Sequence, residues 1–298
     1  ADSGSMSIGE SISTQSGHIT ILAGSTLAQN AGISTNSGTI QISSGQALSM
    51  GANSSTISAG GDVRYQAGNG DIVLNSIDAT DAADSGGNVL VLADAGSILD
   101  LDADSAVNIS AAGLILEAGT SIGAADNHIE TNVVSLSTSS AGGSGTYLTE
   151  SSGITIENLS VEVSTVGADG TLADTTLNKT QEDMSAAGSG NVVLQTTDGL
   201  ITAKGGVDDP DTEDVDESLS AIFAGGNILL QSGEPDEDPA ENDNDISLEA
   251  SVVSNSGSIS IVSADGISQG SYGNIETRTA EKSIDVFAAD EISMADGA

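Results

Sequence analysis

The sequence predicts an all-β protein, a three-sided parallel β-helix, from two observations: a short strand phrase that recurs and the spacing between its copies. In each phrase aliphatic and polar residues alternate between glycine or asparagine boundaries. Alternation with a period of two indicates strands of about five residues, and no window has the apolar spacing of a helix. We therefore expect almost no helix. The phrases include SGHITILA ending at Ala23, SGTIQISS ending at Ser44, GDIVLNS from Gly70, GNVLVLA from Gly87, GNVVLQT from Gly190, GNILLQS from Gly226, NDISLEA from Asn244 and GSISIVSA from Gly257.

The spacing of three glycines gives the length of one coil. Gly17, Gly38 and Gly61 lie 21 and 23 residues apart, and three short strands separated by turns fit between the first two. Stacked coils of this length place inward aliphatic side chains in ladders about 4.8 Å apart. Parallel crossover connections are right-handed. We expect a single right-handed β-helix over residues 1–298.

A longer period indicates a super-repeat of about 240 residues. The segment ITILAGSTLAQ from Ile19 matches ISIVSADGISQ from Ile259 at an offset of 240, and Ile40 matches Ile284 at 244. The chain therefore begins and ends in the same phase of this repeat. Solenoids stack repeat on repeat, so we expect copies of this unit to meet end to end, within one polypeptide or between chains.

Three segments interrupt the strand phrases and are expected as loops near 166–188, 205–218 and 233–245. The second and third contain all three prolines and many acidic residues. Proline cannot donate a hydrogen bond to a strand ladder, which excludes these two from the sheet. The stretch 166–188 lacks alternation and is expected as a loop for that reason.

The charge balance excludes two classes of partner. The chain has 44 acidic and 5 basic residues, a formal net charge of −39, and no cysteine. Nucleic acids and anionic lipid surfaces bind clustered Lys and Arg, which are absent here. No apolar run approaches the roughly 18 residues that span a bilayer. We expect no nucleic-acid partner and no membrane insertion.

The acidic segments allow two interpretations, a solvated acidic surface or bound calcium. Carboxylate oxygens are ligands that Ca²⁺ prefers, but DLDADS from Asp100 lacks the glycine and the later glutamate of an EF-hand loop. No metal site or other cofactor is therefore assigned, and calcium stays open. The candidate ligands are Asp100, Asp102, Asp104, Asp236, Asp238, Asp243 and Asp245.

The residues that catalysis on a β-helix needs are scarce. Polysaccharide lyases use Arg or Lys to neutralise substrate carboxylates, whereas Arg64 and Arg278 lie many coils apart. His18 and His128 are separated by about five coils, which disfavours a triad or a two-histidine metal site. We expect no enzyme, with a lyase-like β-helix as the remote alternative. Both histidines, and Tyr65, Tyr147 and Tyr272, are expected at outward or corner positions.

Four segments carry a likeness to a known family: GSTLAQNAGISTNSGTIQISSGQALSM, GGDVRYQAGNGDIVLNSIDA, GGNVLVLADAGSI and GLILEAGTSIGAADNHIET. They resemble the repeats of filamentous-haemagglutinin-type exoproteins and related giant bacterial surface proteins. The resemblance implies a right-handed parallel β-helix exported to the bacterial cell surface, where it serves as a stalk or adhesive fibre. The implied partners are copies of itself and glycans or proteins of host or neighbouring cells. The alternative is a calcium-stabilised adhesin that binds its ligand through the loops at 205–218 and 233–245.

Overall fold

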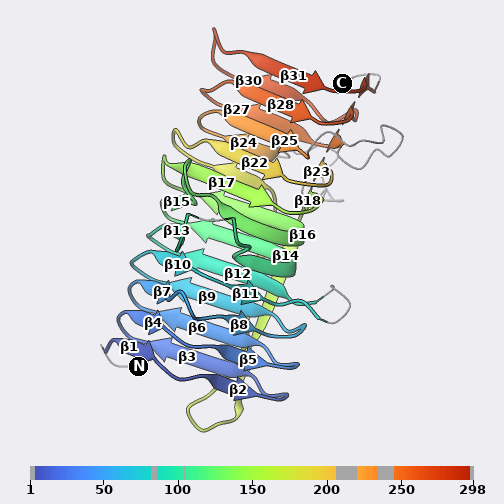
Figure 1. The fold of residues 1–298 in the computed structure, drawn as a ribbon. Coiled ribbons are helices and arrows are strands. Elements are labelled where there is room, and N and C mark those ends of the chain that lie inside the picture. Colours follow the sequence, from blue (N-terminus) through green and yellow to red (C-terminus); the bar gives the residue numbers. More distant parts are fainter. Residues whose placement is uncertain (1–3, 82–85, 104, 206–219, 234–244, 296–298) are drawn as a thin grey trace. The chain divides into compact units, whose positions relative to one another are not determined.

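The computed structural model describes residues 4–81, 86–103, 105–205, 220–233 and 245–295 (Figure 1). These residues form 32 strands and no helix, so the all-β prediction is confirmed. None of them forms a helix that could cross a bilayer. Contacts divide the chain into two compact units. Unit 1 is Ala1–Val133 with Ser160–Thr180, and unit 2 is Val134–Leu159 with Gln181–Ala298.

Unit 1 consists of parallel coils with three faces. Each coil contributes a longer strand to face 1, which begins just after a glycine corner, and shorter strands to faces 2 and 3. Each of these coil strands pairs in parallel with the strand on the same face of the neighbouring coil. Face 1 contains β3 (Ile19–Ala23), β6 (Ile40–Ser44), β9 (Val63–Ala67), β12 (Asn88–Ala93) and the second half of β14 (Ile109–Ala118); face 2 contains β1 (Met6–Ile8), β4 (Leu27–Gln29), β7 (Leu48–Met50), β10 (Ile72–Leu74), β13 (Ile98–Asp100) and β15 (Ser121–Ile122); face 3 contains β2 (Ile12–Thr14), β5 (Ile33–Thr35), β8 (Thr56–Ile57), β11 (Ile77–Asp78) and the start of β14.

Unit 2 repeats the three-faced parallel arrangement. One long strand, β16 (Ile129–Ser140), contributes residues to each unit, and its last three residues pair with β21. The parallel β-helix predicted from the strand phrases is confirmed in both units. Face 1 contains β17 (Gly145–Glu150), β22 (Val192–Thr196), β25 (Ile228–Ser232), β28 (Ile259–Ser263) and β31 (Ile284–Ala288); face 2 contains β18 (Ile154–Ile156), β23 (Ile201–Ala203), β26 (Ile246–Leu248), β29 (Ile267–Gln269) and β32 (Ile292–Met294); face 3 contains β21 (Met184–Ala186), β24 (Ser220–Ala224), β27 (Ser251–Ser254) and β30 (Ile275–Thr277).

The register of face 1 confirms the coil length read from the glycines. Ile19 pairs with Ile40, Ile40 with Val63, and Val63 with Val89, so like residues meet coil after coil. The super-repeat also has a structural meaning, because Ile19 and Ile259 each supply the first inward residue of a face 1 strand. Residues 240 to 244 apart therefore occupy equivalent positions in their coils.

The core of each unit is a set of inward ladders of Ile, Val and Leu. On face 1, Ile40, Val63, Val89 and Leu114 are each 0% exposed. Parallel strands that pack inside a closed coil bury every second side chain, which explains the period of two in the sequence.

Tyr65 departs from the outward position expected for it. Its side chain is 0% exposed, points into the core of unit 1, and donates a 2.6 Å hydrogen bond to Gln29 Oε1. Its hydroxyl also lies 2.6 Å from Thr56 Oγ1. Burial raises the pKa of Tyr65, and the two hydrogen bonds only partly oppose this shift. The phenol is accepted in the core because polar groups from two other strands satisfy it.

The other tyrosines differ from each other. Tyr147 lies on the outer side of face 1 and is 9% exposed, whereas Tyr272 is 61% exposed. Both therefore have the outward or corner position expected for them, although Tyr147 is almost fully covered.

The stretch 166–188 is not the loop that the sequence predicted. It contains all of β20 (Leu172–Gln181), which forms a two-stranded sheet with β19 (Leu159–Val166), and it contains β21 of face 3. The segments 205–218 and 233–245 lie outside the described residues, except at their ends.

Glycine at the corner between faces 3 and 1 is required by the close approach of successive coils. A Cβ atom added at Gly38 would lie 2.1 Å from the carbonyl oxygen of Gly17, and one added at Gly61 would lie 2.0 Å from that of Gly38. Both contacts are with backbone, which cannot move without breaking the ladder. The glycine spacing in the sequence thus reports a steric requirement of stacking.

We expect Gly38→Ala to lower the free energy of unfolding by about 2 kcal/mol or more, because the added methyl overlaps the coil below. Gly9→Ala in the same unit is the control, since its Cβ would meet nothing within 4 Å. Thermal denaturation followed by circular dichroism compares the two variants. Equal melting temperatures would show that the corner does not need glycine.

Candidate functional site

A row of polar residues follows the glycine corner of face 1. Each member is the residue directly before the first inward residue of a face 1 strand. We call His18, Thr39, Asp62 and Asn88 the unit 1 row, and Asn191, Asn227, Ser258 and Ser283 the unit 2 row. The super-repeat aligns His18 with Ser258 and Thr39 with Ser283.

In unit 1 this row holds the hairpin of β19 and β20. Figure 1 shows the yellow-green hairpin crossing behind the strands of unit 1, across the direction in which they run. Every second residue of β19 makes a hydrogen bond to a successive coil. These bonds are Asn88 Nδ2 to the Ser160 carbonyl (2.9 Å), the Glu162 amide to Asp62 Oδ2 (2.7 Å), the Ser164 amide to Thr39 Oγ1 (3.1 Å) and the Val166 amide to Thr20 Oγ1 (2.9 Å).

Apolar packing accompanies these hydrogen bonds. Between the bonded residues of β19, Val161 and Val163 are 1% and 0% exposed. On the outer side of face 1, Leu90 and Ile115 pair with each other and are also fully buried. The hairpin therefore turns part of the outer surface of unit 1 into a second apolar layer.

One ion pair joins the other strand of the hairpin, β20, to the coils of unit 1. Lys179 on β20 lies 2.5 Å from Glu117 on β14. Both side chains are about one-third exposed, so this contact contributes little to stability compared with the buried valines.

We expect Asp62→Ala to loosen the hairpin, because Asp62 accepts from the amide of Asn88 in the next coil and from the amide of Glu162 in β19. Loss of both bonds should cost about 1–3 kcal/mol and speed amide exchange across residues 160–166. Asp71→Ala is the matched control, since Asp71 accepts from the next coil, at the amide of Ser97, and bonds to no described residue of β19. Hydrogen exchange that changes equally in both variants would contradict the anchoring role.

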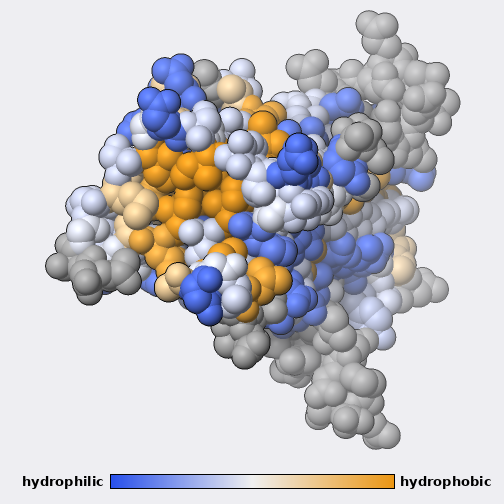
Figure 2. Space-filling view, turned by 90° about the horizontal axis from the view of Figure 1, so that it is seen from below, coloured by the Kyte–Doolittle hydropathy of each residue, from blue (hydrophilic) through white to orange (hydrophobic). Residues whose placement is uncertain are grey.

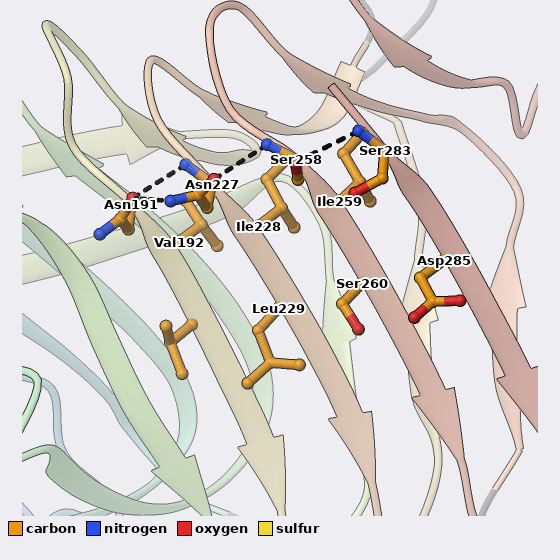
Figure 3. Close-up of a pocket in the computed structure, with 11 residues that line it drawn as sticks. Asn191, Val192, Asn227, Ile228, Leu229, Ser258, Ile259, Ser260, Ser283 and Asp285 are labelled. Carbon is orange, nitrogen blue, oxygen red and sulfur yellow. Dashed lines mark hydrogen bonds between the residues drawn. The ribbon is translucent and has the colours of Figure 1, made fainter. Parts of the chain in front are cut away.

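In unit 2 the equivalent surface is an open groove of about 370 Å³. The unit 2 row forms one wall, and the outward residues Val193, Leu229 and Ser260 line it beside them (Figure 3). These three residues are partly exposed, in contrast to Leu90 and Ile115 of unit 1. Asp285 lines the groove at its last coil.

The unit 2 row is ordered by hydrogen bonds between its own members. Asn191 Oδ1 accepts from the backbone amide of Asn227 at 2.8 Å, and Asn227 Oδ1 accepts from that of Ser258 at 2.9 Å. Ser258 Oγ accepts from the amide of Ser283 at 3.3 Å. Figure 3 shows this chain of bonds running from coil to coil along the wall. Three hydrogen bonds thus join the four members of the unit 2 row across successive coils.

A second candidate surface is the uncovered rim of the outermost coils. In the first coil of unit 1, Met6 and Ile12 are exposed, and in the last coil of unit 2 so are Ile284, Ile292 and Met294. Viewed from below, the rim that β1–β3 form shows a cluster of apolar side chains (Figure 2). Each rim also carries strand edges whose backbone groups face away from the paired side.

Among the acidic candidates for calcium, the structure describes Asp100, Asp102 and Asp245. Asp104, Asp236, Asp238 and Asp243 fall outside the described residues. Where the chain is described, no three acidic or histidine side chains come together as a metal site. Asp245 Oδ1 instead accepts a 2.7 Å hydrogen bond from the amide of Gly266 in the next coil. Calcium binding remains a prediction.

Asp100 has a structural environment of its own. Its Oδ1 accepts a 2.6 Å hydrogen bond from Asn108 Nδ2, while Oδ2 is buried and bonds to no described residue. Burial raises the pKa of the Asp100 carboxyl, and the hydrogen bond from Asn108 partly opposes this shift. The ionised carboxylate is therefore less favourable in the folded chain than in the unfolded one.

We expect Asp100→Asn to raise the melting temperature at pH 7, because the amide keeps the acceptor for Asn108 and removes the buried charge. The folded-state pKa of Asp100 is above the unfolded value, so protonation stabilises the folded chain as pH falls through the folded pKa. The gain from Asn should shrink over the same pH range. Asp102→Asn, at an exposed neighbour, is the control. A gain that does not vary with pH would contradict this explanation.

The histidines do not form a common site. His18 lies in the unit 1 row, half-buried, where its Nδ1 accepts from the amide of Thr39 at 3.1 Å. Burial lowers the pKa of His128, which lies just before β16. Arg64 bonds to Gln66, and Arg278 bonds to Glu276 two residues away on the same exposed edge. Each arginine thus bonds to a residue two positions away.

Sequence reasoning missed the hairpin site and the groove. The signal available was the loss of alternation in NVLVLA of β12 and LILEA of β14, where apolar residues occupy outward positions as well. A continuous apolar run indicates a strand covered on both sides.

Comparison with protein family models, with characterised proteins and with solved structures finds no match to this chain.

Proposed function

We propose that the chain is a structural repeat module of a fibre on the outer surface of a bacterial cell, in which coils of one module stack on coils of the next. The observation that carries this proposal is that residues 240 to 244 apart occupy equivalent positions of the coil, so that β31 carries inward residues like those of β3. In both units, strands pair in register with the same face of the neighbouring coil. A rim is the place where the next coil would pair.

The two rims have matching sequences on all three faces. The inward residues Ile284, Val286 and Ala288 of β31 correspond to Ile19, Ile21 and Ala23 of β3. Aliphatic ladders of this kind are what joins the coils inside each unit. The other two matches are ISM of β32 with MSI of β1, and IET of β30 with IST of β2.

The proposed partners are therefore copies of the same repeat, either in one polypeptide or in separate chains. Export to the cell surface follows from the resemblance to filamentous-haemagglutinin-type repeats. Adhesion to glycans or proteins of other cells accompanies the fibre role and would use the sides of the coils. The net charge of −39 keeps such modules soluble and opposes their contact at low ionic strength.

The test is assembly of the purified chain. We expect linear particles in electron microscopy and a mean mass that rises with protein concentration and with salt, because salt screens the like charges. Met294→Asp, on the rim at 62% exposure, should reduce this mass. Ile57→Asp, on β8 at 42% exposure, adds the same charge on a coil that is paired on both sides, and should leave the mass unchanged.

Two results would contradict the proposal. One is a monomer at every concentration and salt level. The other is assembly that Met294→Asp and Ile57→Asp affect equally while circular dichroism shows both variants folded.

A further inference from the structure

The groove of unit 2 and the hairpin site of unit 1 are built from the same positions of the coil. In both, the residue before the first inward residue of face 1 supplies the polar wall, and the residue after it supplies the outward floor. In unit 1 a strand of this chain fills that surface. In unit 2 the described residues leave it open.

The chemistry of the two walls is also alike. Asn88 and Thr39 in unit 1 hold backbone groups of β19 through a side-chain amide and a hydroxyl. The unit 2 row consists of two asparagines and two serines. Ser258 and Ser283 carry hydroxyls like that of Thr39. The side-chain amides of Asn191 and Asn227, which donate to Tyr147 and to Asn191, would exchange these bonds for backbone carbonyls of the strand. Backbone amides and carbonyls of an extended strand are what such a row can bind, whatever the side chains of that strand.

The floor adds a preference for apolar side chains. Leu90 and Ile115 lie on the outer side of face 1 and are fully buried, beside Asn88, to which the hairpin is bonded. In unit 2, Val193 and Leu229 likewise pair with each other on the outer side of face 1, but they are partly exposed. Covering them with valine side chains would remove apolar surface from water.

We propose that the groove of unit 2 binds an extended strand of the β19 type, supplied by another copy of this repeat. The strand would cross the coils, place one backbone group near each member of the unit 2 row, and turn valines onto Val193 and Leu229. The super-repeat supports this occupant. Ser258 and Ser283 are the equivalents of His18 and Thr39, and β19 bonds to the coils that contain those two residues, at Thr20 and Thr39. The inference rests on the proposed function, since it requires a second copy. It adds a lateral contact to the contact between rims.

The experiment uses the full chain and a labelled synthetic peptide of residues 159–181. The chain carries Met294→Asp, which weakens assembly through the rims. Peptide binding to the groove is then measured on a chain that does not assemble, and it can succeed or fail independently of the proposed fibre. The chain's own hairpin occupies the unit 1 row, so the open site is the groove. We expect saturable binding of one peptide per chain in fluorescence anisotropy.

Two matched variants locate the binding. Ser260→Lys places a long side chain in the groove, whereas Ser268→Lys makes the same change on face 2 of the same coil. We expect Ser260→Lys to weaken binding at least tenfold and Ser268→Lys to leave it unchanged. A peptide with Val161→Asp and Val163→Asp should also lose binding, since it cannot cover the floor.

The absence of saturable binding would overturn the proposal. So would binding that the two lysine variants affect equally, because the peptide would then occupy a different surface. A third result would assign the groove to a glycan instead. In that case an oligosaccharide would bind, Ser260→Lys would weaken its binding, and the peptide would not bind.

Discussion

Backbone hydrogen bonds between neighbouring coils are the interaction on which this structure depends. In a parallel β-helix a strand finds no partner within its own coil, and its amides and carbonyls are satisfied only by the coils on either side. Like residues must then meet face by face, as Ile40 meets Ile19 and Val63. Corner glycines, aliphatic ladders and capping side chains such as Asp62 and Asp71 all follow from this single requirement.

The sequence allowed much of this to be predicted, because the stacking requirement leaves periodic marks. Alternating ITILA and IQISS specify the inward ladder, and Gly17, Gly38 and Gly61 mark a corner that tolerates no Cβ. The super-repeat was visible for the same reason. Equivalent coils need equivalent residues, so the period survives even where insertions change the chain length between strands.

Contacts without a period could not be predicted. Tyr65 can lie inward because its hydroxyl forms hydrogen bonds with Gln29 and Thr56. These residues are 36 and 9 positions away in the sequence, so no periodic pattern marks the contact. The hairpin was missed because it forms no strand pair with any coil. Instead β19 crosses four coils, and every second residue of it makes one hydrogen bond to a coil. Only the apolar outward residues Leu90 and Ile115 hinted that something covers face 1.

The hairpin also changes how unit 1 would respond to a pulling force along its axis. A plain solenoid loses coils one at a time, since each is held only by its neighbours. By fastening four successive coils from outside, β19 joins them into a block that must yield together. A fibre composed of such modules would unfold under tension in steps of several coils. The coils bonded to β19 would need the higher force, and the coils without such a strand would unfold at a lower force.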